Sequence, residues 1–441
     1  MATTAVAIPG KERQAFLQQW ADSRALTDRL FEIVQPEALY DRPIAERHRI
    51  VFYIGHLEAF DWNLLAPVLG LESRQPGLDR LFAFGIDPVG GGLPTDQPSD
   101  WPRIEEVRRY VTSVRQALDD GLKQDGLGSA DSVRLNVALE HRLMHAETLA
   151  YMFHQLPLDR KVAQTAGRAL PAPSVKPRMI EIPGGQATLG RPRPRPGEET
   201  TEDFGWDNEF EGHTVAVPPF AIDAYNVTNG QFLDFIKASG YSERGLWTEA
   251  DWNWVQSEGV SHPRFWTEKG GQWFYRAMFT EEPLSLDWPA YVSHAEASAY
   301  ARWVGKRLPT EAEFHRAAYN SAAGEREYPW GDEPPAERHG NFDFRHWDPV
   351  PVGSYPAGRS AAGVEDLVGN GWEWTSTVFE PFAGFQPYTF YPGYSANFFD
   401  GKHYVMKGGS PRTAACMLRR SFRNWFQPHY PFVYAGFRCV A

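Results

Sequence analysis

The sequence changes character near residue 170, and this change constrains the fold more than any other feature. In the part before it, apolar side chains recur at spacings of three and four, with few glycines between them. This period is typical of amphipathic helices. It predicts helices over 12–30, 44–69, 104–124 and 129–154, which favour an up-and-down four-helix bundle. The glycine- and proline-rich stretch 82–102 is predicted to be a long loop.

Beyond residue 178 the sequence has a different pattern, in which short strand-like pieces alternate with Gly, Pro, Asn and Asp. Only 229–239 and 294–304 are predicted to be helices there. Aromatic residues make up 14% of the chain, and most of its 16 tryptophans lie in this half. We therefore expect an α+β protein with a helical domain over 1–163, a linker over 164–178 and a loop-rich domain with little regular structure over 179–441.

The charge balance and the cysteine content exclude several classes of protein. The chain has 56 acidic and 44 basic residues, a formal charge of −12. A field of that sign repels phosphate groups, which argues against nucleic acids and anionic membranes as partners. The sequence has no apolar run long enough to cross a membrane and no recognisable signal peptide. Two cysteines, Cys416 and Cys439, are too few for a disulfide framework, so we expect a cytoplasmic protein.

Two histidines of the last predicted helix, His141 and His145, carry the sharpest chemical signal. At about 100° per residue they lie about 40° apart on one helix face, so both imidazoles can reach one metal ion. Glu147 lies about 200° from His145, so it is expected to support the ligands rather than be one. His56, on the second predicted helix, is the obvious third ligand, because facing helices of a bundle direct side chains inward. Three neutral imidazoles fit a catalytic Zn(II) or a nonheme Fe(II); the alternative is that the paired histidines are surface or capping residues.

Five short motifs of the second half resemble the sulfatase-modifying-factor (formylglycine-generating-enzyme) domains, which are related to C-type lectins. They are GKRLPTEAEF (305–314), YPWGD (328–332), DLVGNGWEWT (366–375), KGGS (407–410) and GFRCV (436–440). The first half resembles the DinB-like four-helix bundle, whose His-x-x-x-His-x-Glu signature matches 141–147. In this order, the two halves together resemble the ergothioneine-biosynthesis sulfoxide synthases and the related selenoneine synthases.

This resemblance implies a mononuclear nonheme iron enzyme with Fe(II) as cofactor and O₂ as co-substrate. The three iron histidines of the family correspond to His56, His141 and His145. These enzymes join sulfur or selenium to C2 of the imidazole of hercynine, the trimethylated betaine of histidine. The donor is cysteine, γ-glutamylcysteine or, in selenoneine synthases, a selenosugar. The copper-binding cysteine pair of the formylglycine-generating enzymes is not reproduced, and Cys416 and Cys439 are expected to be buried structural thiols.

The segment 423–426 resembles the part of these enzymes that holds hercynine. A trimethylammonium group donates no hydrogen bonds and is held by aromatic faces. This role is expected for Trp425 and Phe426, with Asn424 meeting the substrate carboxylate and Arg423 beside them. The alternative is that these aromatic rings only fill the core.

The sequence departs from the sulfoxide synthases at two places that bear on the donor. One branch carries a tyrosine pair after a Leu-Phe in the long loop, whereas here Phe84 follows and there is no tyrosine. Met144 stands where a substrate-contacting glutamine is common. Another branch of the family carries the tyrosine that delivers a proton and an electron after the WEWT motif. The same segment here offers Tyr388, Tyr391 and Tyr394 as candidates, and spacing does not choose among them.

The long loop favours an uncharged donor, because its carboxylates accept hydrogen bonds from hydroxyl groups and its tryptophan can stack on a sugar. The residues concerned are Phe84, Asp87, Asp96, Asp100 and Trp101. An anionic γ-glutamyl donor would want clustered arginines, and only Arg103 is nearby in sequence. We therefore hypothesise a selenoneine synthase that uses a selenosugar. The close alternative is a hercynine sulfoxide synthase using cysteine or γ-glutamylcysteine, followed by a DinB-type metal-dependent thiol transferase and a non-catalytic lectin-like binding protein.

Overall fold

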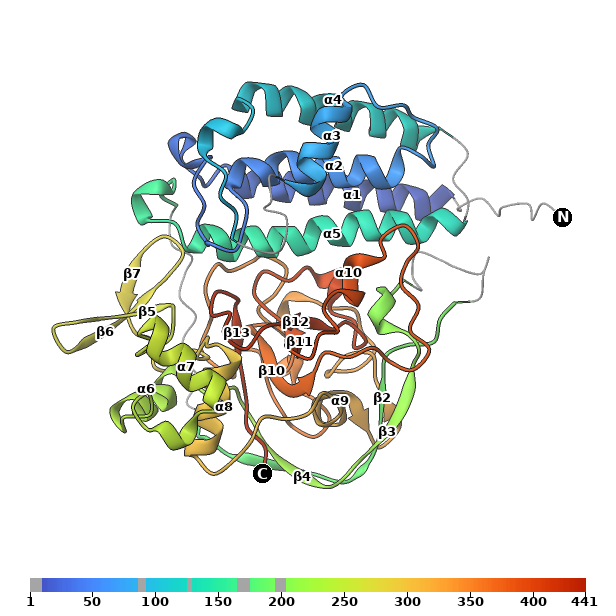
Figure 1. The fold of residues 1–441 in the computed structure, drawn as a ribbon. Helices are drawn as coiled ribbons and strands as arrows, with labels where there is room; N and C mark the ends of the chain where they lie inside the picture. The colour runs from blue at the N-terminus through green and yellow to red at the C-terminus, as the bar shows by residue number, and fades with distance from the viewer. Residues whose placement is uncertain (1–9, 86–92, 125–128, 165–174, 195–203) are drawn as a thin grey trace. The chain divides into compact units, whose positions relative to one another are not determined.

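The computed structural model of the protein describes residues 10–85, 93–124, 129–164, 175–194 and 204–441. Contacts along the chain divide the protein into two units (Figure 1). The first comprises Met1–Gln164 and Pro194–Phe204, and the second comprises Thr165–Arg193 and Gly205–Ala441. The expected domain limits at 163 and 179 remain a prediction, since 165–174 lie outside the described residues.

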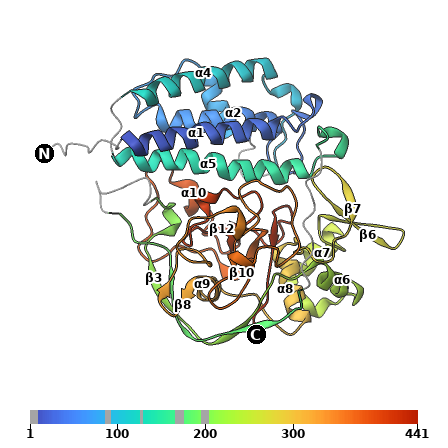
Figure 2. The same cartoon turned by 180° about the vertical axis from the view of Figure 1, so that it is seen from behind.

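The first unit contains the four long helices that the apolar period predicts. They are α1 (Gly10–Phe31), α2 (Ile50–Leu65), α4 (Ile104–Lys123) and α5 (Ser129–His154). Helix α1 packs on α5, and α2 packs on both α4 and α5 (Figure 2). The mixed α and β content of the whole chain and the helical first unit confirm the expected fold class.

Helix α2 is shorter than predicted at its start, where we expected residue 44. The backbone N–H of Ile50 donates to the carbonyl of Asp41 at 3.1 Å, and that of Val51 donates to Leu39 at 2.7 Å. These bonds satisfy the first helical donors from outside the helix, so it begins at Ile50. At the other end the helix stops at Leu65, two residues before Pro67, which cannot continue it.

A further helix, α3 (Pro76–Phe84), overlaps the first residues of the predicted long loop over 82–102. Pro76 begins it, since proline is well suited to a first helical turn, and Gly85 with φ 72° ends it. Its residue Phe82 is fully buried against α2. The prediction of a loop over 82–102 was therefore wrong for its first residues, and 86–92 lie outside the described residues.

The second unit is built on a central sheet with the strand order β12-β11-β10-β13. Only the pairing of β13 with β10 is parallel. The strands of this sheet are β10 (Gly371–Val378), β11 (Tyr404–Gly409), β12 (Asn424–Phe426) and β13 (Ala435–Gly436). Short antiparallel ribbons are formed by β1 (Met179–Ile182) with β4 (Phe220–Asp223), β2 (Gly185–Leu189) with β3 (His213–Val217), β5 (Trp266–Lys269) with β6 (Gln272–Arg276) and β7 (Glu281–Pro283), and β8 (Asn320–Ser321) with β9 (Gly324–Glu325).

This unit holds more helix than predicted. Helices α6 (Asn229–Lys237) and α8 (His294–Trp303) confirm the two expected ones, but α7 (Glu249–Glu258), α9 (Glu311–Tyr319) and α10 (Gly393–Ala396) were missed. The signal for two of them was present as caps. The hydroxyls of Thr248 and Thr310 accept the backbone N–H groups of Asp251 and Glu313, the threonine-x-x-acid pattern of a helix start.

Aromatic side chains fill the second unit, as its composition predicts: Trp206, Trp372 and Trp374 are among its largest fully buried residues. The two cysteines differ in their surroundings. Cys439 is buried, whereas Cys416 is exposed in a short turn, so the prediction that both are buried thiols was wrong for Cys416. None of the helices in the described residues is long and apolar enough to span a membrane.

Candidate metal centre

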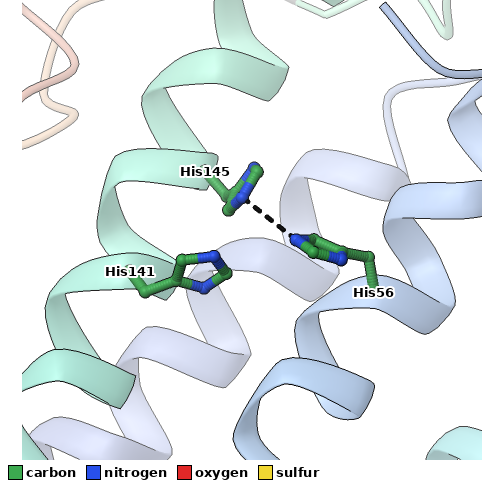
Figure 3. Close-up of side chains that lie close together, drawn as sticks. All are labelled: His56, His141 and His145. Carbon is green, nitrogen blue, oxygen red and sulfur yellow. Dashed lines mark hydrogen bonds between the residues drawn. The ribbon is translucent and has the colours of Figure 1, made fainter. Parts of the chain in front are cut away.

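Three histidines from two neighbouring helices of the first unit point toward one another (Figure 3). His56 lies on α2, and His141 and His145 lie one turn apart on α5. Their ligand nitrogens all lie within 4.8 Å of one another, and Nε2 of His56 is 3.3 Å from Nε2 of His145. Two nitrogens bound to one ion at about 2.1 Å are about 3.0–3.4 Å apart for octahedral or tetrahedral angles. The observed spacing therefore fits a shared ion.

The short helix α3 determines which nitrogen of His56 faces the cluster. Nδ1 of His56 lies 2.7 Å from the backbone carbonyl of Phe82. Because a carbonyl oxygen only accepts, Nδ1 carries the proton and Nε2 presents its lone pair to the other histidines. Gly55 permits this contact, since a Cβ there would lie 2.4 Å from the ring of Phe82. The tautomer of His56 thus depends on a helix that the sequence prediction did not contain.

The three imidazoles are held in their neutral form. Burial is the main cause that lowers the pKa of His56 to about 4. The charges of His48 and Arg142 act in the same direction, and the hydrogen bond to the Phe82 carbonyl opposes them. Burial also holds the pKa values of His141 and His145 well below the usual range, with neighbouring histidines as the next cause. Neutral imidazole is the form that binds metal ions, so this environment favours a metal over protons.

Each imidazole packs against at least one aromatic ring from α2. Phe52 stacks on His56 with ring centroids 4.7 Å apart, and Phe60 stacks on His141 at 3.4 Å. The ring of Tyr53 lies 5.7 Å from that of His145. These rings restrict rotation of the imidazoles and keep water from that side of the cluster. Sequence reasoning missed them, although Phe52 and Phe60 stand four residues on either side of His56, the spacing of side chains on one helix face.

The other residues predicted for this part of the site lie on α3 and α5. Glu147 is buried on α5, at 8% exposure, and is not a member of the converging group. Met144 is half-buried on the same helix. Phe84 ends α3, but its side chain lies outside the described part of the structure.

The loop residues that favoured a sugar donor are engaged in structural contacts. The buried carboxylate of Asp96 accepts hydrogen bonds from Arg42, from Arg49 at 2.8 Å and from the indole of Trp101 at 2.7 Å. The carboxylate of Asp100 accepts a hydrogen bond from the backbone N–H of Gln97 at 2.7 Å. Arg42 and Arg49 lie far from the loop in sequence but bind to it in the fold, so Arg103 is not the only arginine near the loop. Asp87 lies outside the described residues.

In the second unit, the predicted hercynine segment forms β12 at the edge of the central sheet. The ring of Trp425 stacks on Phe379 at 4.2 Å with an angle of 6°, and Phe426 stacks on Tyr430 at 5.1 Å. Asn424 accepts the backbone N–H of Trp425 through its side-chain oxygen. All three strand residues are half-buried, so part of each side chain faces outward.

Arg423 differs from the three residues that follow it, because it is only 2% exposed. Its Nε donates to Glu311 at 3.1 Å, and its guanidinium lies 4.1 Å from the ring centroid of Phe382. A side chain held on both sides in this way anchors the start of β12, and its position fits that role better than contact with a substrate.

The three tyrosines left open by the sequence have distinct surroundings within the second unit. Tyr388 donates its hydroxyl hydrogen to the carbonyl of Gly205. Burial raises the pKa of Tyr391 to about 12, with the charge of Asp207 as the second cause. Tyr394 stacks on Trp206 at 3.9 Å and meets the ring of Trp425 at 5.4 Å. Tyr394 therefore contacts the predicted hercynine segment through Trp425.

Comparison with known proteins agrees with the resemblance seen in the motifs. Residues 166–441 match the family model of the sulfatase-modifying factor enzyme 1-like domain, and residues 18–149 match that of the DinB superfamily. The hercynine oxygenase of Mycobacterium tuberculosis is 38% identical over 436 residues, covering 95% of this chain and 96% of that protein. The hercynine oxygenase of Mycolicibacterium thermoresistibile is 34% identical over 99% of this chain and 96% of that protein. Ergothioneine biosynthesis protein 1 of Neurospora crassa is 28% identical over 93% of this chain and 55% of that protein.

Proposed function

We propose, from the premise that this chain belongs to the hercynine oxygenase family, that it oxidises hercynine with O₂ at an Fe(II) ion held by His56, His141 and His145. The observation that carries the proposal is the convergence of the three imidazoles, with two Nε2 atoms 3.3 Å apart. Their low pKa values and the proton on Nδ1 of His56 support metal binding rather than proton transfer.

Fe(II) bound by three imidazoles would supply one-electron chemistry with O₂ and open coordination positions for a donor. Around the ion, the chain's own residues orient the imidazoles and exclude water. The rings of Phe52 and Phe60 hold two of the imidazoles in place and exclude water from that side of the cluster. Water exclusion matters here because it strengthens the electrostatic interactions of the site and limits side reactions.

The binding of hercynine is proposed to use the rings of β12. A trimethylammonium group over an aromatic face gains about 0.5–2 kcal/mol, and Trp425 and Phe426 offer such faces. Asn424 is proposed to meet the carboxylate of hercynine. Tyr394 is the preferred candidate for the phenol that holds the transferred proton, because it contacts Trp425 while Tyr388 is bonded to a backbone carbonyl.

The proposed reaction forms a bond between C2 of the hercynine imidazole and the chalcogen of the donor. In the sulfur case the C2–H and S–H bonds break and the C2–S bond forms. One oxygen atom of O₂ is placed on sulfur and the other leaves as water, so that O₂ takes up all four electrons. A selenol donor would be joined to C2 in the same way.

The donor is the finer part of the proposal, and two observations bear on it in opposite directions. The loop without a tyrosine pair supports the selenosugar and hence a selenoneine synthase. The use of Asp96 and Trp101 in structural contacts, with Arg42 and Arg49 as partners of Asp96, removes part of the reason to expect a sugar. The relatives' names point toward the ergothioneine pathway. We therefore propose an oxygenase that forms a C–S or C–Se bond to hercynine. A selenosugar is one candidate donor, and cysteine and γ-glutamylcysteine are the alternatives.

The test is oxygen uptake after anaerobic loading with Fe(II). Hercynine is supplied with a selenosugar, a thiosugar, cysteine or γ-glutamylcysteine, and the products are identified by mass spectrometry. We expect uptake only when hercynine and a donor are both present, and a product that contains both. No uptake with any pair would refute the oxygenase. Transfer of a thiol with Zn(II) and without O₂ would establish the DinB-type thiol transferase instead.

A further inference from the structure

We propose that a buried ionic network centred on Arg142 sets the spacing of α2 and α5, and through it the affinity of the three histidines for their metal. The Arg142 network consists of Arg142, Glu58 and Asp61, with Arg24 and Arg115 at its margin. Arg142 is thus a positioning residue of the site. The inference rests on the proposed function for the identity of the metal, but its geometry comes from side chains that touch no metal.

Arg142 connects the neighbours of two ligands on different helices. It directly follows His141 on α5, and its side chain is 0% exposed. Its Nη2 donates to the carboxylate of Asp61, lies 2.9 Å from Glu58 and lies 3.3 Å from the carbonyl of Leu57. Leu57 directly follows His56 on α2. One guanidinium therefore ties together the backbone segments that carry two of the converging histidines.

The other two long helices join the same network through Glu58, whose side chain is 1% exposed. Arg115 of α4 donates to Glu58 at 2.9 Å, and Arg24 of α1 lies 3.8 Å from it. Arg115 and Arg24 each have a second carboxylate, Asp28 at 2.7 Å and Asp119 at 2.6 Å. The marginal arginines thus keep an acidic partner even if Glu58 loses its charge.

Stability alone is a poor reason for this arrangement. Taking charges out of water costs about as much as their attraction returns, and well-packed apolar residues of similar volume often stabilise a core equally well or better. A buried guanidinium does provide fixed directions, because its planar fork binds its acceptors in one geometry. Metal affinity needs such precision, since ligands must be held within tenths of an ångström. The network lies where that precision is required, between the helices that carry His56 and His141.

The decisive variant replaces the central charges together. Arg142→Met and Asp61→Leu replace the directly paired arginine and carboxylate with apolar groups, and Glu58→Gln keeps an acceptor for Arg115 and Arg24. Because no buried charge is left without a partner, this triple variant should fold. Asp119→Asn is the matched control, since it weakens only a marginal ion pair with Arg24, between α1 and α4, and leaves Arg142, Glu58 and Asp61 unchanged.

Two measurements are made on each protein: thermal unfolding of the metal-free form by circular dichroism, and Fe(II) affinity by anaerobic competition with a chromophoric chelator. We expect the triple variant to unfold near the temperature of the wild type but to bind Fe(II) about 10–100-fold more weakly, the usual effect of removing a group that orients ligands. Asp119→Asn should leave the affinity within about twofold, as expected of a pair that is partly exposed.

A folded triple variant with wild-type Fe(II) affinity would overturn the inference. If the triple variant does not fold, Arg142→Lys tests the inference instead. It keeps the positive charge but lacks the planar guanidinium that meets three acceptors. It should fold and lose Fe(II) affinity, and an unchanged affinity would equally overturn the inference. Wild-type protein that binds Fe(II) but consumes no O₂ would refute the proposed function and leave the network standing. Wild-type protein that binds neither Fe(II) nor Co(II) would refute both.

Discussion

Gly55→Ala tests how closely α3 must approach α2 for His56 to work as a ligand. The new Cβ would lie 2.4 Å from the ring of Phe82, well inside van der Waals contact. Replacing glycine by alanine inside a helix gains about 1 kcal/mol, whereas overpacking of this kind costs about 1–3 kcal/mol. We therefore expect a net loss of unfolding free energy of up to about 2 kcal/mol. The displaced Phe82 carbonyl would also release Nδ1 of His56, which should weaken Fe(II) binding about 10–100-fold.

The assays are urea unfolding of the metal-free protein and anaerobic chelator competition for Fe(II). Gly77→Ala is the matched control, since Gly77 lies in α3 with no atom within 4 Å of its added Cβ. It should be neutral or stabilise by up to about 1 kcal/mol and leave the metal affinity unchanged. Phe82→Ala removes the ring, so it should cost about 1–3 kcal/mol less in the Gly55→Ala background than in the wild type. Gly55→Ala protein that is more stable and binds Fe(II) as tightly as the wild type would refute the reasoning.

Three further outcomes are expected. His141→Ala should abolish Fe(II) binding measured by chelator competition, whereas Glu147→Gln should only weaken it, and equal losses would contradict the separate roles. Trp425→Leu should raise the KM for hercynine about 2–30-fold through a loss of about 0.5–2 kcal/mol, and an unchanged KM would remove this ring from the substrate site. Asp207 is fully buried and has a pKa raised by burial from 3.8 to about 6. Because the folded state holds that proton more tightly than the unfolded one, stability should fall as pH rises from 4 to 6, by about 2–3 kcal/mol. Asp207→Asn should flatten this part of the urea-unfolding profile, and an identical profile in the variant would exclude Asp207 as its source.

The sequence alone determined the features that depend on neighbours along the chain. The apolar period located α1, α4 and α5 because each helix buries one face and its spacing is local. The His141 and His145 pair follows from the same geometry, since residues one turn apart share a face. The five motifs of the second half identified its family before any strand was placed. In α7 and α9 the threonine caps are the local signal that indicates a helix start.

Tertiary structure decided what needs groups distant in sequence to meet. The proton on Nδ1 of His56 depends on a carbonyl of α3, which Gly55 allows to approach. Arg423, beside the predicted substrate residues in sequence, is instead buried against Glu311. In the sequence, Arg142 is a charged residue between two histidines with no sign of a special role. In the structure it is buried and links α5 to α2. The helical period of the sequence predicts which face of a helix a residue occupies. It does not predict the partner of that residue, because burial and pairing depend on how the helices pack.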